Sequence, residues 1–355
     1  MTEHIERPTI PFINNLRGRR VTLIGGAGFI GHHLALELAS RGADVQVVDG
    51  LQVNNLMCIA SQSNLPNREL YLRMLHERLD LLRTANIALH TVDARDYLKL
   101  GHTLSEFKPQ TIVQLAAVAH ANRSNKDPYT TFDHSLRTLE NALDYSRGGC
   151  VDHFIYFSSS MVYGNFQSTQ IDEDHPLNPL GIYGALKLSG EKIVIAYQQV
   201  FDLPYTIIRP SALYGPRCVS RRVSQIFLEN ALAGQPIRID GDGCESIDFT
   251  YVDDLVNGIC LAIDRPSARN ETFNLTCGNA RTINELVDIV KQYCPSVEVQ
   301  YTERDELRPF RGTLSIQKAN DLLGYSSAHQ LEQGIPKCVD WYRRNGLSRR
   351  ASAVA

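Results

Sequence analysis

The sequence predicts an α/β fold built on a doubly wound parallel sheet, with a smaller C-terminal lobe. Short apolar strand candidates alternate with helical stretches as far as about residue 210, a pattern typical of such sheets. A glycine-rich turn joins the first strand to the first helix, and beyond residue 210 the pattern changes to basic loops and short elements. The predicted strands are 21–24, 45–48, 87–92, 111–116, 153–158 and 205–209.

The turn after the first strand reads Gly25-Gly26-Ala27-Gly28-Phe29-Ile30-Gly31 and leads into a helix. Gly25, Gly28 and Gly31 let the backbone turn tightly, approach a pyrophosphate and pack the helix against the strand. The first N–H groups of the helix have no partner within it, so they attract the anion. The turn therefore predicts a Rossmann-type dinucleotide site, which Phe29 and Ile30 also contact.

The second strand ends at Asp49, about twenty residues after the last of these glycines. A carboxylate at this place accepts hydrogen bonds from a ribose 2′-hydroxyl and repels a 2′-phosphate. Because Gly50 and Leu51 follow and no arginine stands there, we expect NAD rather than NADP. The alternative is that Asp49 only ends the strand.

The segment between Asn54 and Thr84 is unusually long for the connection between two strands. Residues 69–82 have helical periodicity with charged faces. The segment is either a longer second helix or an insertion over the site, and the sequence leaves both possibilities open.

Tyr183 and Lys187 stand four positions apart, and the serine run Ser158-Ser159-Ser160 lies upstream. On a helix this spacing places phenol and ammonium on one face, where the cation favours an ionised phenol that takes a proton from a sugar-type hydroxyl. The pair alone is a weak signal, because surface helices often carry it by chance. Following a nucleotide-binding turn in this chain order, it predicts an active site that uses the phenol as a base.

The composition agrees with a soluble enzyme. A chain of 355 residues with 43% hydrophobic content can bury a large core, and its net charge of −3 offers no basic field for nucleic acid. No stretch approaches the roughly twenty apolar residues of a membrane span. The first 18 residues lack the apolar core of a signal peptide, so we expect a cytoplasmic protein. The eight cysteines and the histidines lack ligand spacing, so we expect reduced thiols and no metal site.

Further motifs extend the pattern from about Arg20 to Trp341. They are Gly25–Gly31, Asp93–Asp96, Leu115–Ala117, Ser158–Gly164, Tyr183 with Lys187, Tyr214–Arg217, Asp248–Asp254 and Leu323–Tyr325. On these residues the chain resembles the extended short-chain dehydrogenase/reductase family. It is similar in particular to the NAD-dependent sugar-nucleotide epimerase and dehydratase branch, which includes the UDP-glucose and UDP-glucuronate 4-epimerases. The resemblance implies an NAD-binding domain, a C-terminal substrate lobe and a homodimer.

The resemblance also implies roles for single residues. Tyr183 is the expected catalytic base, Lys187 lowers its pKa and holds the nicotinamide ribose, and Ser159 bridges substrate and phenol. Ser159 is chosen because the family's catalytic hydroxyl commonly lies three positions before the Val of Val-Tyr-Gly; Ser158 and Ser160 are the alternatives. The other cofactor contacts that it implies are Asp93, Ala94, Leu115, Ala116, Ala117 and Ser158.

The residue after the serine run bears on the reaction. Relatives that eliminate water or carbon dioxide carry an acidic residue where this chain has Met161. An acid–base pair for a second chemical step is therefore absent from this place. The simplest outcome of oxidation is return of the hydride to the other face of the ketone, which is epimerisation, in this family at C4.

Two departures from the family concern the substrate. Ala212 replaces an asparagine, and Ile247 an arginine, that commonly contact the substrate diphosphate. Because a charge-assisted bond contributes about 1.5–3 kcal/mol, either other residues compensate or the substrate carries no diphosphate. The candidates are Arg217, Arg221, Arg222, Arg304, Arg308 and Arg311, and the resemblance favours Arg308 and Arg311; Ser124 and Ser160 are further candidate substrate contacts. His134 replaces an asparagine beside Ser124, and we expect a core histidine rather than a residue of the cleft.

The sequence thus predicts a C4 epimerase for a nucleotide sugar with tightly held NAD. The alternatives are an NAD-dependent oxidoreductase or epimerase for a sugar phosphate or nucleoside, a 4,6-dehydratase, and a non-catalytic NAD-sensing module. The predicted regions are an N-terminal extension (1–18), an NAD-binding domain with the catalytic residues (19–210), a mainly substrate-binding lobe interleaved with it (211–345) and a tail (346–355).

Overall fold

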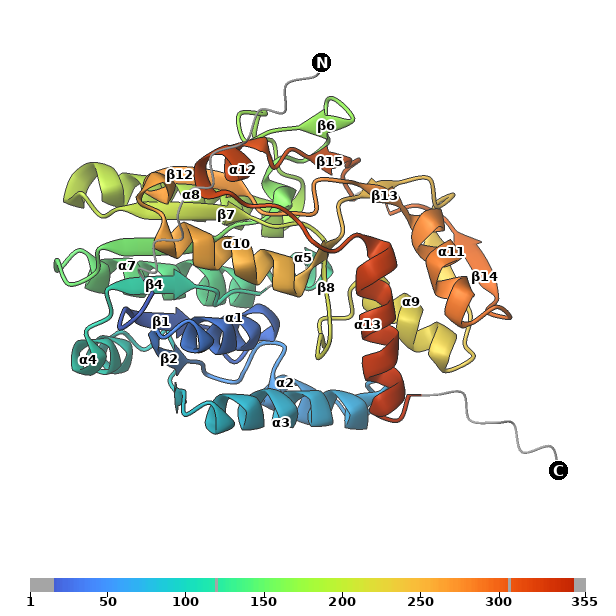
Figure 1. Ribbon diagram of the computed structural model, residues 1–355, viewed down its shortest axis with the longest axis horizontal. Coiled ribbons are helices and arrows are strands. Elements are labelled where there is room, and N and C mark those ends of the chain that lie inside the picture. Colours follow the sequence, from blue (N-terminus) through green and yellow to red (C-terminus); the bar gives the residue numbers. More distant parts are fainter. Residues whose placement is uncertain (1–15, 119–120, 306–307, 348–355) are drawn as a thin grey trace, which may run out of the picture.

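The computed structural model describes residues 16–118, 121–305 and 308–347 (Figure 1). Its centre is a seven-stranded sheet in the order β12-β7-β5-β4-β1-β2-β3, in which every neighbouring pair is parallel. The strands are β1 (Arg20–Ile24), β2 (Asp44–Val48), β3 (Ala88–His90), β4 (Thr111–Gln114), β5 (His153–Phe157), β7 (Tyr205–Arg209) and β12 (Glu271–Asn274). The predicted doubly wound parallel sheet is confirmed.

Helices cover both faces of the sheet because successive strand residues point to opposite sides. Leu23 and Val113 pack against one set of helices, and their neighbours Ile24 and Ile112 pack against the other. The first set is α1 (Phe29–Ser40), α10 (Val252–Asp264) and α12 (Gln317–Leu323). The second is α4 (Tyr97–Phe107), α7 (Thr138–Ser146) and α8 (Gly181–Phe201). Because the strands are parallel, their carboxyl ends lie together at one edge of the sheet, which is where such folds bind ligands.

All six predicted strands are present, with ends that differ by up to two residues. The predicted strand 111–116 ends at Gln114, and the predicted strand 87–92 spans only Ala88–His90. The seventh strand, β12, was not predicted. It comes from the part of the chain beyond residue 210 and pairs with β7, so the C-terminal part interleaves with the sheet.

The long connection after β2 forms α2 (Leu56–Ala60) and α3 (Arg68–Thr84). The first half of α3 packs into a second apolar cluster that belongs mainly to C-terminal elements. These are α9 (Val223–Leu232), α11 (Ile283–Tyr293), α13 (Leu331–Arg344) and the parallel pair β9 (Ile237–Asp240) and β14 (Val299–Thr302). Figure 1 shows α3 running along one edge of the molecule from the sheet to α13. The segment is therefore a helical connection, and its first part also lines the large cavity described below, through Asn54, Cys58, Ile59, Gln62 and Leu65.

Short elements complete the fold. The two-stranded ladders are β6 (Gln170–Ile171) with β15 (Thr313–Leu314), β8 (Leu213–Tyr214) with β11 (Thr250–Tyr251), and β10 (Ser246–Ile247) with β13 (Arg281–Thr282). The short helices are α5 (Ala121–Lys126), α6 (Pro128–Phe132), a π-helical turn (Asp133–Arg137) and two 3₁₀ turns (Ser160–Val162 and Pro266–Ala268). In the three described ranges, no helix combines the length and the apolar character needed to cross a membrane.

Candidate active site

A cavity of about 950 Å³ lies between the carboxyl ends of the central strands and the C-terminal elements. Tyr183, Lys187 and all three serines of the run line it. A smaller cavity of about 140 Å³ lies next to it, over the glycine-rich turn. Ile30, Asn54, Leu115, Ala117, Ser220 and Arg222 line both cavities. The two cavities therefore form neighbouring parts of one site.

The candidate catalytic residues come from the first turns of α8 and from the end of β5. The spacing of Tyr183 and Lys187 places both in the cavity wall, as their helical separation predicts. Lys187 Nζ donates to the carbonyl oxygen of Phe157, the last residue of β5, at 2.6 Å. Burial lowers the pKa of Lys187 to about 8, and the charge of Glu191 partly opposes that shift.

The three serines differ in what their hydroxyl groups contact. Ser158 donates to Glu191 on α8, so its hydroxyl is engaged in the core. Ser159 accepts from the backbone N–H of Met161 at 3.2 Å, and a hydrogen bond between Ser159 and the phenol of Tyr183 lowers the pKa of Tyr183. Ser160 lines the cavity. Of the three, Ser159 contacts the candidate base.

A buried ion pair holds this region in place. Glu191 on α8 and Arg209 at the end of β7 form a two-bonded pair, with Nε–Oε1 2.9 Å and Nη2–Oε2 2.8 Å. Arg209 also donates to the hydroxyl of Tyr163 at 3.0 Å. Because Ser158 donates to the same carboxylate, the pair fixes the end of β5 against α8, where the candidate catalytic residues meet.

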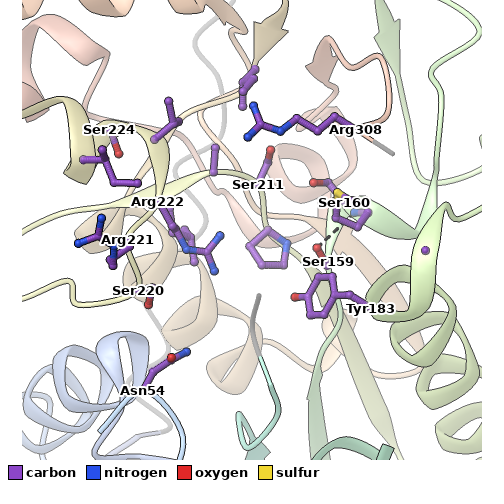
Figure 2. A pocket seen from close by; sticks show the side chains of 18 of the residues that line it. Asn54, Ser159, Ser160, Tyr183, Ser211, Ser220, Arg221, Arg222, Ser224 and Arg308 are labelled. Atoms are coloured by element: carbon purple, nitrogen blue, oxygen red, sulfur yellow. Dashed lines mark hydrogen bonds between the residues drawn. The ribbon is translucent and has the colours of Figure 1, made fainter. Parts of the chain in front are cut away.

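Tyr183 has its pKa raised by burial, and two groups act against the shift. The larger is the charge of Arg222, and the smaller is the hydrogen bond with Ser159. Figure 2 shows Ser159 and Tyr183 on one side of the cavity and Arg222 extending into it from the other. Lys187 was predicted to lower this pKa; its ammonium instead donates to Phe157 in this structure.

Five arginines line the same cavity, namely Arg221, Arg222, Arg238, Arg308 and Arg311. Burial lowers the pKa of Arg311, and the charges of Arg308, Arg222 and Arg304 lower it further, whereas the charge of Glu245 acts against the shift. Arg308 pairs with Asp240 at 2.6 Å. The buried Nε atoms of Arg222, Arg304 and Arg311 lack a hydrogen-bond acceptor among the residues that the structure describes. The cavity thus presents more positive charge than its own carboxylates neutralise.

Two predicted substrate residues lie elsewhere. Arg217 donates to Glu77 at 3.0 Å and to His32 at 2.9 Å, and it is not among the described residues that line either cavity. Ser124 is fully buried on α5 and is likewise not part of either described wall. Met161, Ala212 and Ile247, which depart from the family, all line the large cavity.

The smaller cavity is lined by the glycine-rich turn and the ends of β1, β2 and β4. It includes the predicted cofactor residues Gly25, Gly28, Phe29, Ile30, Gly31, Asp49, Asp93, Ala94, Leu115, Ala116 and Ala117. The first turn of α1 has no side-chain cap and no acidic residue, so its N–H groups are available to an anion. A Cβ atom on Gly31 would lie 2.5 Å from Gly26, so only glycine permits this close packing of helix against turn. These features fit a dinucleotide.

Two carboxylates lie at the adenosine end of this cavity. Asp49 accepts from the N–H groups of Ala27 (3.0 Å) and Leu51 (2.7 Å), and burial raises its pKa. Asp93 pairs with Arg95 at 2.6 Å, and these hydrogen bonds hold the pKa of Asp93 well below its usual range. The two N–H donors of Asp49 act against the rise in its pKa, and Asp49 lines the cavity. Its contact with a ribose stays a prediction.

Several residues of the cofactor cavity were not predicted. His134 was expected in the core, but it is half-buried and lines the cavity together with Thr138. The reason is the π-helical turn Asp133–Arg137, which changes the face that this segment presents and has no clear signal in the sequence. Arg78 is a second omission. It occupies a position in the apolar stripe of α3, and a charged residue in such a stripe is the signal that could have identified it.

The eight cysteines all lie in the described ranges, and none of them forms a disulfide. Across the described ranges, no three His, Cys, Asp or Glu side chains come together as metal ligands would.

Comparisons with known proteins agree with this geometry. Residues 21–276 match the model of the NAD dependent epimerase/dehydratase family. A putative UDP-glucose 4-epimerase of Methanocaldococcus jannaschii is 29% identical over 92% of this chain and 99% of its own length. A dTDP-glucose 4,6-dehydratase of Xanthomonas campestris pv. campestris is 28% identical over 90% of this chain and 92% of its own.

Solved structures give the same result. UDP-glucose 4-epimerase of Thermotoga maritima with UDP-glucose superposes with a TM-score of 0.78 at 28% identity, covering 92% of this chain and 99% of that one. The UDP-glucose 4-epimerase of Thermus thermophilus in complex with NAD has a TM-score of 0.77 at 27% identity, covering 91% and 99%. NAD is therefore the cofactor of the protein described here, and its glycine-rich turn, Asp49 and Asp93 line a cavity that fits NAD. The chain belongs to the NAD-dependent epimerase/dehydratase family.

Proposed function

We propose that this enzyme epimerises a nucleotide sugar at C4, with NAD held throughout the reaction. The observation that carries the proposal is the large cavity itself. Tyr183 and Ser159 lie on one side of it, Arg222 extends into it from the other side, and Arg308 and Arg311 also line it. A sugar hydroxyl and a diphosphate are the two groups that such walls suit.

The acid–base work belongs to Tyr183. In the proposed reaction its phenolate takes the proton of the C4 hydroxyl and later returns it. Ser159 donates a hydrogen bond to the sugar oxygen as charge develops on it. Arg222, across the cavity, favours the ionised phenol. We assign Lys187 to the nicotinamide ribose. NAD supplies acceptance and return of the hydride.

Epimerisation rather than elimination is supported by Met161. A dehydration needs an acid beside the sugar to protonate the leaving hydroxyl, and the thioether of Met161 cannot do this. With no acid at this place to catalyse elimination, the reaction open to the ketone is return of the hydride. Because the sugar can rotate within a cavity of about 950 Å³, that return can reach either face.

A diphosphate is supported by the arginines that could replace the contacts missing at Ala212 and Ile247. Arg311 and Arg222 each bring a guanidinium whose buried Nε lacks a described acceptor, and Arg308 adds a third charge. Charge-assisted bonds to phosphate are among the stronger polar contacts. We therefore assign the substrate diphosphate to Arg222, Arg308 and Arg311, with Ser160 as a contact of the sugar.

Thermal stabilisation of the NAD-loaded protein tests this assignment. The panel contains UDP, dTDP, GDP and CDP sugars, beside sugar phosphates and nucleosides. We expect one nucleotide series to stabilise, by about 2.7 kcal/mol at a hundredfold excess over Kd, and an isomerised sugar to be recovered afterwards. Arg311→Ala should remove the stabilisation, whereas Arg137→Ala, an exposed arginine paired with Glu140 on α7, should not.

The result that would replace this proposal is equally specific. A silent nucleotide series together with a response to sugar phosphates or nucleosides would mean that Ala212 and Ile247 report a different substrate class. Sustained NADH production would then identify a net oxidoreductase, the second function that these two residues support.

We also propose a homodimer in the cytoplasm. Helices α4, α6 and α8 expose Leu98 (79%), Tyr129 (86%) and Val200 (70%), and large exposed apolar side chains are suited to an interface. Light scattering on a gel-filtered sample tests the proposal, which predicts twice the mass of the chain; a monomer at micromolar concentration would refute it.

A further inference from the structure

Arg78 is the largest of the fully buried side chains, with 1% of its surface exposed. It lies on the inward face of α3, in line with Tyr71, Met74, Leu75 and Leu82, which are all buried. A charged group at such a position is costly unless something compensates for the lost hydration. The compensation must come from the groups around it.

The partners of Arg78 within the chain are carbonyl oxygens. Its Nε donates to Arg217 O at 3.2 Å, its Nη2 donates to the same oxygen, and its Nη1 lies 3.5 Å from Ala27 O. No described carboxylate lies within ion-pair distance of it. The groups whose charge favours its protonated form are Cys218 and, to a smaller extent, Asp49. Burial lowers the pKa of Arg78 to about 10. Its positive charge therefore lacks a close counter-ion among the described residues.

The position of Arg78 indicates which bound anion could act as its counter-ion. Arg78 lines the smaller cavity together with Gly28, Phe29 and Asp49, and Ala27 belongs to the turn that leads into α1. A dinucleotide bound there places its pyrophosphate at the start of α1. A buried cation against that turn adds to the positive end of the helix dipole.

We propose that Arg78 is a cofactor-binding residue, contributed by the long β2–β3 connection, whose buried guanidinium attracts the NAD pyrophosphate and holds the glycine-rich turn in place. Through Arg217 O it also holds the start of the loop 217–222, which carries Ser220 and Arg222 to the boundary of the two cavities. NAD binding and the placement of Arg222 thus depend on the same side chain. This role concerns the cofactor and does not rest on which sugar the enzyme uses.

Binding calorimetry with three ligands tests the proposal. The ligands are NAD, ADP-ribose, which keeps the pyrophosphate, and adenosine, which lacks it but keeps the ribose that faces Asp49. In Arg78→Met we expect NAD and ADP-ribose to bind at least about tenfold more weakly, since a charge-assisted contact is lost, while adenosine changes by less than about twofold. Arg78→Lys, which keeps the charge, should fall between the wild type and Arg78→Met.

The matched control is Arg83→Met, an exposed arginine on the same helix that pairs with Asp80 and should leave all three affinities unchanged. Equal weakening of adenosine and ADP-ribose would overturn the proposal, because Arg78 would then only brace the fold. Unchanged NAD binding in a folded Arg78→Met would overturn it as well. If Arg78→Met does not fold, Arg78→Lys decides: a loss of affinity for ADP-ribose that adenosine does not share supports the proposal, and an equal loss for both ligands contradicts it.

Discussion

At the scale of single residues, the site depends on burial more than on pairing. Tyr183 and Lys187 both lie in an environment that disfavours their charged forms, and the opposing groups are few. Arg222 and Ser159 act on the phenol, and Glu191 acts on the ammonium. These groups come from several segments of the chain, so the tertiary fold sets the acid–base chemistry.

Removal of the phenolic hydroxyl should separate chemistry from cofactor binding. Tyr183→Phe keeps the ring in the cavity wall and removes the only atom that exchanges a proton. We expect turnover to fall by about 10²–10⁴-fold, the usual contribution of a general base, with an unchanged Kd for NAD. Steady-state kinetics and calorimetry measure the two. Tyr301→Phe, at an exposed position on β14, is the control, and full activity of Tyr183→Phe would remove Tyr183 from its proposed role.

Lys187 should leave a signature in the pH dependence of stability. Its pKa is about 8 in the folded protein, below its ordinary value of 10.5, so between these pH values the unfolded chain binds the extra proton. Stability from this group therefore rises with pH across that window, and the cost of burying the ammonium is present in full below about pH 8.

Lys187→Met removes this titration. Between pH 7.5 and pH 10 the free energy of unfolding of the wild type should therefore increase by roughly 1–3 kcal/mol more than that of Lys187→Met. Urea unfolding at several pH values measures the difference, in which the other titrations cancel. A difference that stays constant with pH would show that Lys187 titrates normally.

At the scale of elements, the sequence was most informative where function constrains the backbone. The strand–turn–helix of β1 and α1 was predicted closely, because glycines at this spacing between a strand and a helix are typical of a nucleotide-binding turn. The strand β12 was not predicted. It spans only Glu271–Asn274 and becomes a strand by pairing with β7. A short segment whose partner is distant in the chain carries little local signal.

Helix α1 should fail if its contact with the turn is blocked. In Gly31→Ala the added Cβ would lie 2.5 Å from the Gly26 backbone, so the helix must move away from the turn. We expect NAD affinity to fall by more than about tenfold and the Tm to drop. Gly101→Ala in α4 has open space around its Cβ and should be neutral or stabilising by up to about 1 kcal/mol. NAD binding by Gly31→Ala at the wild-type affinity would contradict the packing argument.

Helix α3 is attached to the C-terminal lobe through Glu229. This buried carboxylate on α9 accepts hydrogen bonds from Asn67, Tyr71, Gln225 and Tyr342. Glu229→Gln replaces one acceptor oxygen with a donor that faces other donors. We expect a loss of about 1–3 kcal/mol in urea unfolding, against less than about 0.5 kcal/mol for Glu69→Gln, whose side chain is exposed. An unchanged midpoint for Glu229→Gln would mean that α3 is held by its apolar face alone.

At the scale of the whole molecule, the order of motifs along the chain identified the fold, the cofactor and the family. The substrate side was less accessible from sequence. Arg217 was a candidate for the diphosphate because it follows Tyr-Gly-Pro, yet its guanidinium turns toward His32 and Glu77. The conformation of a loop decides which of its arginines face a cavity. In the loop 217–222, Arg217 and Arg221 have positive φ angles, which the local sequence does not predict. The division into regions 1–18, 19–210, 211–345 and 346–355 stays a prediction.

The central claim is that the hydride removed from the sugar returns to the same carbon. The most direct measurement follows a nucleotide sugar labelled with deuterium at C4, using NMR for the sugar and absorbance for NADH. The account predicts a mixture of the two C4 epimers, each with the label retained at C4, and no accumulation of NADH. Accumulating NADH, or a product that has lost water and carries the label at another carbon, would contradict it.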